Sequence, residues 1–298
     1  MISTANSAAD SSLQEPQSRA ALRKARRVVV KAGTSVIANE DGSPSLTRLG
    51  AIVEQIAELN HEGVEVIFVS SGAVGMGKNL LRKQARLNMS FKELHSNPHS
   101  SDTMNQVMSS GSLNTLGDTR LTQKSVINNL MTVDEHMETS VAKSYAAAGQ
   151  FELMNLYQSL FSPKGITASQ LLLTQADFAN THHLKNLTFA VERLLGLGIV
   201  PIINENDACS IYGDDDADPV FSDNDSLAAV CARTFGAEVL VLLTDVDGVY
   251  DRPPSNPKAK IIPFYAVDQR VAIGDKSSQG RGGMGAKIEA AAGSVEPG

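Results

Sequence analysis

The sequence predicts an α/β protein in which a mainly parallel β-sheet is covered by helices on both faces. From Arg27 onward, short runs rich in Val, Ile and Leu alternate with segments whose apolar residues recur at helical spacing. Polar or Gly-rich sequence follows several of the short runs. Because parallel strands need helical crossovers and are buried on both faces, the alternation indicates a doubly covered parallel sheet.

The predicted elements begin with a βαβ unit. A strand over 28–31 contains three consecutive Val residues and ends in a turn at Gly33. A helix over 46–59 carries its apolar residues on one face and is closed by Gly63, and a second strand covers 64–70. After a helix near 141–161, the prediction continues with strand 166–173, helix 184–197, strand 200–204, helix 226–235 and strand 239–244.

Two segments fall outside this alternation. Residues 1–26 are rich in Ser and Ala and are expected to form a disordered tail rather than a transit peptide, because Asp10 and Glu15 do not fit the acid-poor composition of transit peptides. Residues from about 78 to 136 are rich in Ser, Asn, Met and Thr and have weak periodicity. We interpret them as a surface insertion, partly helical and partly mobile.

Composition argues against several classes of function. The net charge is -7, aromatic residues are 5% and Trp is absent, which argues against binding nucleic acid by charge or by stacking. No apolar run reaches the about 18 residues of a membrane-spanning helix, so no membrane association is expected. Cys209 and Cys231 are too few for a disulfide scaffold and indicate a reducing compartment. The cytoplasm is expected, with the mitochondrion as the alternative.

A Gly-rich segment follows the strand over 64–70. Its spacing from Gly72 to Lys78 matches a phosphate-binding P-loop, but Asn79 stands where that loop needs a Ser or Thr hydroxyl for Mg²⁺. We therefore interpret it as a strand-to-helix turn whose backbone N–H groups, with the hydroxyls of Ser70 and Ser71, face an anionic ligand. Tight packing at a turn is the alternative.

Two motifs that resemble metal sites do not have a complete ligand set. The acidic segment 214–218 opens like a calcium loop, but Pro219 and Asp225 stand at the positions of its glycine and glutamate, so a solvated acidic loop is expected. The pair His182–His183 lacks a third ligand. No metal site formed by protein side chains is therefore expected.

Polar and Gly-rich sequence at strand ends predicts where a ligand binds, because ligands of open α/β sheets lie beyond the carboxyl ends of the strands. The glycine spacing of Gly280–Gly285 matches a dinucleotide-binding motif, but no predicted strand precedes it. Its glycines allow close approach of the backbone, and Arg281 and Lys287 add positive charge, so the segment suits a flexible loop that binds an anion. The strand ends with such sequence are Lys31–Gly33, Ser70–Ser71, Asn204–Asp207 and Thr244–Asp245. Together they predict a phosphate or nucleotide site.

Seven stretches, in order along the chain, give the sequence a resemblance to a known family. They are Val28–Val36, Ser70–Val74, Ala146–Gln150, Val200–Ala208, Ser222–Ser226, Leu242–Tyr250 and Gly282–Lys287. On these motifs the chain resembles the glutamate 5-kinases of the amino acid kinase family, and most of all the kinase half of the bifunctional Δ1-pyrroline-5-carboxylate synthases. The Ile-Asn-Glu-Asn-Asp motif together with Asp-Asn-Asp is typical of glutamate 5-kinases rather than of this fold at large.

The resemblance implies a three-layer α/β/α sandwich of the amino acid kinase (carbamate kinase-like) fold over residues 27–298, truncated at the carboxyl end relative to the family. It implies a transferase that uses ATP to phosphorylate the γ-carboxylate of L-glutamate, giving the glutamyl 5-phosphate that starts proline biosynthesis. It also implies Mg²⁺ held chiefly by the ATP phosphates, a homo-oligomer, and a glutamyl phosphate reductase domain or protein as a partner.

The resemblance also assigns roles to residues. Lys31 and Lys287 would stabilise the transferring phosphoryl group, and Asp225 would orient both lysines. The residues expected to bind glutamate are Ser71, Asp207 and Asn224. Those expected to bind the nucleotide are Lys31, Thr244, Asp245, Arg281, Gly282, Gly283, Met284, Gly285, Ala286 and Lys287. A carboxylate nucleophile is already ionised at neutral pH, so no general base is expected.

Two alternatives to this function stay open at the level of sequence. The chain could be a non-catalytic ligand-binding fragment or pseudoenzyme of the same fold. It could also be a kinase of another amino acid substrate, such as aspartate or N-acetylglutamate.

Overall fold

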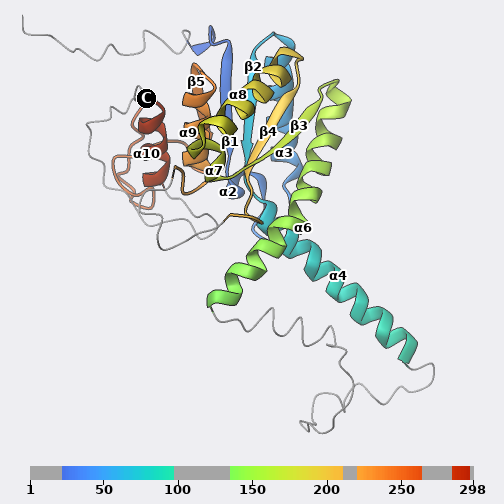
Figure 1. The fold of residues 1–298 in the computed structure, drawn as a ribbon. Coiled ribbons are helices and arrows are strands. Elements are labelled where there is room, and N and C mark those ends of the chain that lie inside the picture. The colour runs from blue at the N-terminus through green and yellow to red at the C-terminus, as the bar shows by residue number, and fades with distance from the viewer. Residues whose placement is uncertain (1–21, 97–134, 211–219, 264–283, 296–298) are drawn as a thin grey trace, which may run out of the picture.

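A five-stranded parallel sheet forms the centre of the computed structural model, which describes residues 22–96, 135–210, 220–263 and 284–295 (Figure 1). The strand order is β3-β4-β2-β1-β5. The strands are β1 Arg27–Ala32, β2 Glu65–Ser70, β3 Ala168–Leu173, β4 Val200–Glu205 and β5 Val239–Leu243. Every pairing is parallel, so all carboxyl ends lie at one edge, and the predicted parallel sheet is confirmed.

Helices cover both faces of the sheet. Val28 and Val30 of β1 point to the face that packs against α3 (Leu46–His61) and α6 (Glu135–Phe161). Val29, which lies between them, points to the opposite face, where α8 (Thr181–Gly196) and α9 (Asn224–Thr234) pack. Because successive side chains of a strand alternate between faces, this run of Val residues contributes to two apolar cores. The predicted three-layer sandwich is confirmed.

Ion pairs at the amino end of β1 hold this strand in place. The Arg27 guanidinium lies 2.8 Å from Glu65 Oε2 of β2, and its two terminal nitrogens lie 2.5 and 2.9 Å from the Glu192 carboxylate of α8. The hydrogen bonds that Arg27 donates to Glu192 and Glu65, together with the charges of both carboxylates, raise the pKa of Arg27, although burial acts in the opposite direction. These contacts tie β1 to a neighbouring strand and to a covering helix.

Helix α4 (Ala73–Ser96) begins earlier than the sequence predicted and continues into the expected insertion. It crosses α6 so closely that a Cβ atom added at Gly77 would lie 1.8 Å from the backbone oxygen of Tyr145. A Cβ atom at Gly149 would lie 1.9 Å from the backbone oxygen of Ala73. From this crossing, α4 and the first part of α6 extend away from the sheet (Figure 1). The expectation of a partly helical segment is thus confirmed over 78–96.

Four helices have no counterpart in the sequence prediction, and three of them contain only three to five residues, too few to display a helical period. The helices that the sequence did not predict are α2 Thr34–Ile37, η2 Ser162–Lys164, α7 Gln175–Ala179 and α10 Met284–Val295. Most of the expected tail, the centre of the expected insertion and the acidic segment 214–218 lie outside the described residues. Within the described ranges, no helix has the length and apolar character needed to cross a membrane.

Candidate active site

The strand ends that the sequence singled out meet at the carboxyl edge of the sheet. Ala32 of β1 pairs with Ser70 of β2 on one side and with Leu243 of β5 on the other. On the far side of β2, Val69 pairs with Ile203 of β4. This register brings the residues just before or after these positions, among them Lys31, Ser71, Asn204 and Thr244, to the same edge. The predicted meeting of polar strand ends is confirmed.

A carboxylate held between two ammonium groups forms the centre of the site. Lys31 Nζ lies 2.6 Å from Asp225 Oδ1, and Lys287 Nζ lies 2.8 Å from Asp225 Oδ2. Lys31 and Asp225 are 4% and 3% exposed. A Cβ atom at Gly33 would lie 3.2 Å from Lys31 Nζ, so the glycine leaves room for the ammonium group. Within this cluster of three groups, two positive charges face one negative charge, which favours an anionic ligand.

Burial lowers the pKa of Lys31 from its ordinary value of 10.5, and the positive charge of Lys287 lowers it further. The charge and hydrogen bond of Asp225, and the charge of Asp223, oppose this decrease. An ammonium group that has lost most of its water interacts more strongly with a charge brought near it, because the surrounding dielectric is low. Lys31 is therefore placed to respond to charge that develops on a bound anion.

Two helix N-termini hold the other members of the cluster. Asp223 caps α9 and accepts hydrogen bonds from the backbone N–H groups of Asp225 and Ser226, at 3.1 and 2.8 Å. This cap places Asn224 and Asp225 in the first turn of α9, facing the strand ends. Lys287 lies in the first turn of α10, which packs against α9 and β5.

An amide network lies beside the charged cluster. Asn224 Nδ2 donates to Ser71 Oγ at 3.0 Å and to Asn204 Oδ1 at 3.1 Å. Asn204 Nδ2 in turn donates to Gln150 Oε1 of α6 at 2.8 Å. Asp207, the third residue expected to bind glutamate, lies half-buried in the turn that follows β4. The structure thus joins Ser71 and Asn224 by a hydrogen bond beside the cluster, and Asp207 follows β4, the strand that carries Asn204.

The expected nucleotide residues lie on the other side, at β5 and α10. Thr244 and Asp245 directly follow β5, and the Thr244 hydroxyl donates to Asp245 Oδ1 at 3.4 Å. Met284, Gly285, Ala286 and Lys287 begin α10 and are half-buried. The remaining residues assigned to nucleotide binding, Arg281, Gly282 and Gly283, lie outside the described residues.

Two expectations about the Gly72–Lys78 segment are wrong. The Ser70 hydroxyl does not face a ligand, because it is buried and lies 2.6 Å from the hydroxyl of buried Tyr157. Gly77 is inside α4, where contact with α6 leaves no room for a side chain. At the turn itself, Gly72 has a φ of +105°, and a Cβ atom there would lie 2.6 Å from Ile37 Cδ1. Tight packing therefore explains Gly72 and Gly77.

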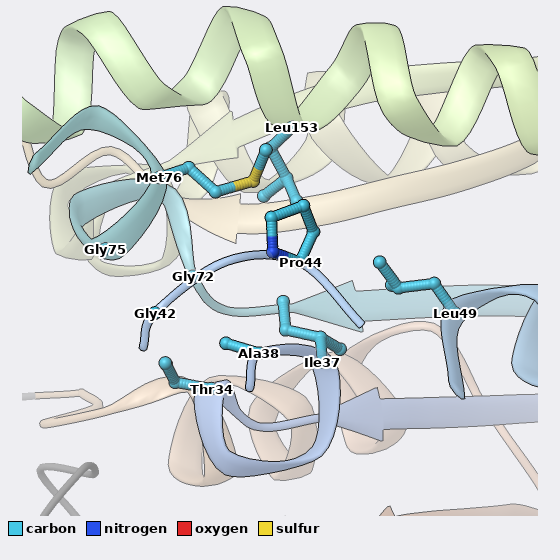
Figure 2. A pocket seen from close by; sticks show the side chains of 10 residues that line it. All are labelled: Thr34, Ile37, Ala38, Gly42, Pro44, Leu49, Gly72, Gly75, Met76 and Leu153. Carbon is cyan, nitrogen blue, oxygen red and sulfur yellow. The ribbon is translucent and has the colours of Figure 1, made fainter. Parts of the chain in front are cut away.

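An apolar cavity of about 180 Å³ lies beside the turn (Figure 2). Figure 2 shows Ile37, Leu49, Met76 and Leu153 around it, with Gly72 in its wall. Its lining contains no charged side chain. The cavity therefore does not suit a phosphate or a carboxylate, and the polar strand ends remain the candidate site.

Sequence reasoning missed two residues that support the site, Gln150 and Tyr157. Both lie on α6 and contact strand-end residues, Asn204 and Ser70. Gln150 belongs to one of the seven stretches that carry the resemblance, which was a usable signal. Tyr157 is an aromatic residue at helical spacing and gave none.

Comparison with known proteins gives three informative relatives. The chain is 41% identical over 279 residues to Delta-1-pyrroline-5-carboxylate synthase 1 of Oryza sativa subsp. japonica, covering 92% of the chain and 34% of that protein. It is 33% identical over 277 residues to glutamate 5-kinase of Symbiobacterium thermophilum, covering 92% and 85%. It is 31% identical over 261 residues to glutamate 5-kinase of Bacteroides thetaiotaomicron, covering 87% and 58%. The chain thus spans about a third of the length of the plant synthase.

The family match covers almost the whole chain. Residues 26–297 match the amino acid kinase family. This range contains all five strands and all the residues of the charged cluster and the amide network. The chain belongs to the amino acid kinase family.

Proposed function

We propose that this chain acts as a glutamate 5-kinase, transferring the γ-phosphoryl group of ATP to the γ-carboxylate of L-glutamate as the first step of proline biosynthesis. The observation that carries the proposal is the buried Asp225 carboxylate between the Lys31 and Lys287 ammonium groups, at the carboxyl edge of a parallel sheet. The similarity to proteins named glutamate 5-kinase supports the choice of substrate.

The reaction needs positioning and charge stabilisation rather than proton transfer. A γ-carboxylate oxygen of glutamate attacks the γ-phosphorus of ATP, forming a new O–P bond, while the bond to the β,γ-bridging oxygen breaks and its electrons leave with ADP. Both the attacking and leaving groups are ionised at neutral pH, so no proton has to move. Lys31 and Lys287 hold positive charge beside the phosphoryl oxygens, and Asp225 fixes the direction of both lysines.

The two sides of the cluster suit the two substrates. The Ser71 hydroxyl and the Asn224 amide can donate to carboxylate oxygens of glutamate, and the Asp207 carboxylate suits its α-ammonium group. Thr244, Asp245 and the start of α10 would contact the nucleotide, together with Arg281, Gly282 and Gly283. Phosphates between these two sides would reach Lys31 and Lys287.

The residues of the site fit magnesium that is carried by ATP. Asp225 directs both carboxylate oxygens to lysines, and no group of three or more potential metal-ligating side chains occurs within the described residues. Phosphate oxygens would therefore supply most of the ligands. When bound, magnesium would neutralise part of the phosphate charge.

The chemistry of the product suggests what acts next. An acyl phosphate is a reactive intermediate, so we propose that a glutamyl phosphate reductase domain or protein consumes it.

We further propose a homo-oligomer located in the cytoplasm, with the mitochondrion as the alternative. Light scattering of the purified chain and imaging of a tagged copy test these two points.

The test of the proposed function is product formation by the purified chain. ADP release is followed with Mg-ATP and L-glutamate, and hydroxylamine is added to trap the acyl phosphate as glutamyl hydroxamate. Lys31→Ala and Lys287→Ala should each lower kcat by about 100- to 1000-fold, with a much smaller change in the KM for glutamate. The matched control is Lys164→Ala, which removes a lysine that pairs with Glu54 away from the site.

The outcomes separate the alternatives. No glutamate-dependent product from the folded chain would refute the kinase activity, and calorimetric binding of glutamate or nucleotide without turnover would instead favour a pseudoenzyme. Faster turnover with aspartate or N-acetylglutamate would change the substrate. Full activity of either lysine variant would remove that lysine from the chemistry.

A further inference from the structure

We infer that Gln150 is a positioning residue of the proposed glutamate site, acting through Asn204 on Asn224. The inference rests on the proposed function, because it concerns the side of the cluster assigned to glutamate. Gln150 lies on α6, whereas the residues assigned to substrate so far lie at strand ends and at the start of α9. It therefore links a different layer of the fold to the site.

Three hydrogen bonds in series connect Gln150 to Ser71. Gln150 Oε1 accepts from Asn204 Nδ2 at 2.8 Å. Asn204 Oδ1 accepts from Asn224 Nδ2 at 3.1 Å, and the same Nδ2 donates to Ser71 Oγ at 3.0 Å. Asn204 is 2% exposed, so water has little access to replace a lost partner. The series is therefore sensitive to the loss of any acceptor.

The direction of each amide follows from its donors and acceptors. Asn224 Nδ2 carries two hydrogens, and both have acceptors, Ser71 Oγ and Asn204 Oδ1. Asn224 Oδ1 faces the backbone N–H of Glu205 at 3.4 Å. If Asn204 turned over, its Nδ2 group would face the Nδ2 group of Asn224, and two donors would meet. Gln150 prevents this by offering an acceptor to the nitrogen end of Asn204.

Helix α6 holds Gln150 rigidly at this place. Gly149 is in direct contact with α4, as the 1.9 Å approach of a hypothetical Cβ atom to the Ala73 oxygen shows. Leu153 and Tyr157, which share a helix face with Gln150, are 1% and 0% exposed. The Tyr157 hydroxyl also forms a hydrogen bond with the hydroxyl of Ser70, the residue before Ser71. One face of α6 therefore contacts the ends of both β2 and β4.

The test is a kinetic comparison of variants of the active chain. Gln150→Leu removes the acceptor and should raise the KM for glutamate about tenfold, with the KM for ATP within about twofold of the wild type. Gln150→Glu keeps an acceptor oxygen and should restore the KM to within about threefold of the wild type. Gln158→Leu is the matched control, because Gln158 is exposed on the same helix, and it should change neither KM.

A double-variant cycle shows whether Gln150 acts through Asn224. In an Asn224→Ala background, Gln150→Leu should raise the KM for glutamate by less than about twofold, because the group that it positions is already absent. Gln150→Asn shortens the side chain by one methylene and moves the acceptor away from Asn204. It is a milder change, for use if Gln150→Leu does not fold, and it should also raise the KM for glutamate.

Different failures identify different errors. Absence of glutamate-dependent turnover in the wild type refutes the proposed function itself. Turnover in the wild type with an unchanged KM for glutamate in folded Gln150→Leu or Gln150→Asn overturns the positioning role alone. Independent, additive effects of Gln150→Leu and Asn224→Ala also overturn it, as does an equal loss of affinity for glutamate and ATP.

Discussion

The two sides of the strand-end site are built differently. On the β2, β4 and α9 side, Asn204 is 2% exposed and belongs to a hydrogen-bonded amide series. On the β5 side, Asp245 is exposed and the Thr244 hydroxyl makes one long bond of 3.4 Å. β4 is buried along its whole length, whereas β5 is only partly buried.

This difference indicates that the two sides of the proposed site would bind their substrates in different ways. The side assigned to glutamate is ordered by protein hydrogen bonds before any ligand arrives, so little reorganisation is needed on binding. The side assigned to the nucleotide has more exposed side chains, which leaves them free to adjust to a ligand. The Lys31–Asp225–Lys287 cluster lies between the two and serves both.

The largest effect is expected where the two sides meet. Asp225→Asn removes the charge that orients Lys31 and Lys287, so kcat should fall by about 100- to 1000-fold. It also leaves two ammonium groups close together without a counter-charge, and the free energy of unfolding should fall by about 3–5 kcal/mol. Hydroxamate formation and urea unfolding measure the two changes. Activity within tenfold of the wild type would contradict the proposed role of Asp225.

The next effect separates the two sides by substrate. Asn224→Ala should raise the KM for glutamate by about 10- to 100-fold, because it removes donors from an ordered network. Thr244→Ala should raise the KM for ATP by about threefold, because its hydroxyl lies on the exposed side. Asn155→Ala, at an exposed position of α6, is the control. The division of the site would be wrong if both variants changed both KM values equally.

A smaller effect on stability is expected at the crossing of α4 and α6, which supports the glutamate side. Gly77→Ala places a methyl group 1.8 Å from the backbone oxygen of Tyr145, so the helices must separate and the free energy of unfolding should fall by about 1–3 kcal/mol. In Gly75→Ala, in the same helix, the added methyl group has no neighbouring atom within 4 Å. This variant should raise the free energy of unfolding by about 0.5–1 kcal/mol, because Ala favours a helix more than Gly does. Equal unfolding midpoints in urea for the two variants would refute the close crossing.

The smallest effect at neutral pH concerns the charge of Lys31. Its folded-state pKa is lowered by burial, so between that pKa and 10.5 the unfolded chain holds a proton that the folded chain has lost. The stability that Lys31 contributes should therefore rise with pH through this window, while activity falls because the neutral amine cannot balance phosphoryl charge. In Lys31→Arg the guanidinium stays charged, so the alkaline decline of kcat/KM should begin at higher pH. Identical pH profiles would exclude Lys31 as the titrating group.

Much of the fold could be predicted from local sequence. All five strands lie within two residues of the predicted boundaries, because runs of β-branched and aliphatic residues signal buried parallel strands. The start of α4 was misplaced, since Gly75 and Gly77 look like turn residues in isolation. The reason for Gly77 lies in a contact with Tyr145, far along the chain.

For the site, the sequence pointed to strand ends, and the resemblance pointed to Lys31, Asp225 and Lys287. The structure places these three side chains within ion-pairing distance. It also corrects Ser70, whose hydroxyl bonds Tyr157, and adds Gln150. Neither the direction of a hydroxyl nor the pairing of amides has a periodic signal in sequence, so the sequence could mark Gln150 through the stretch 146–150 but could not show what these side chains contact.

The sequence by itself determined the parallel sheet with two covered faces, because alternating apolar runs and helical periods bury surface only in that arrangement. It also determined that polar groups follow the strands. Only the tertiary structure decided which polar groups meet, which of them are buried and bonded to other protein groups, and how α6 contacts β2 and β4. These depend on contacts between residues distant in the chain, and packing rather than local propensity selects them.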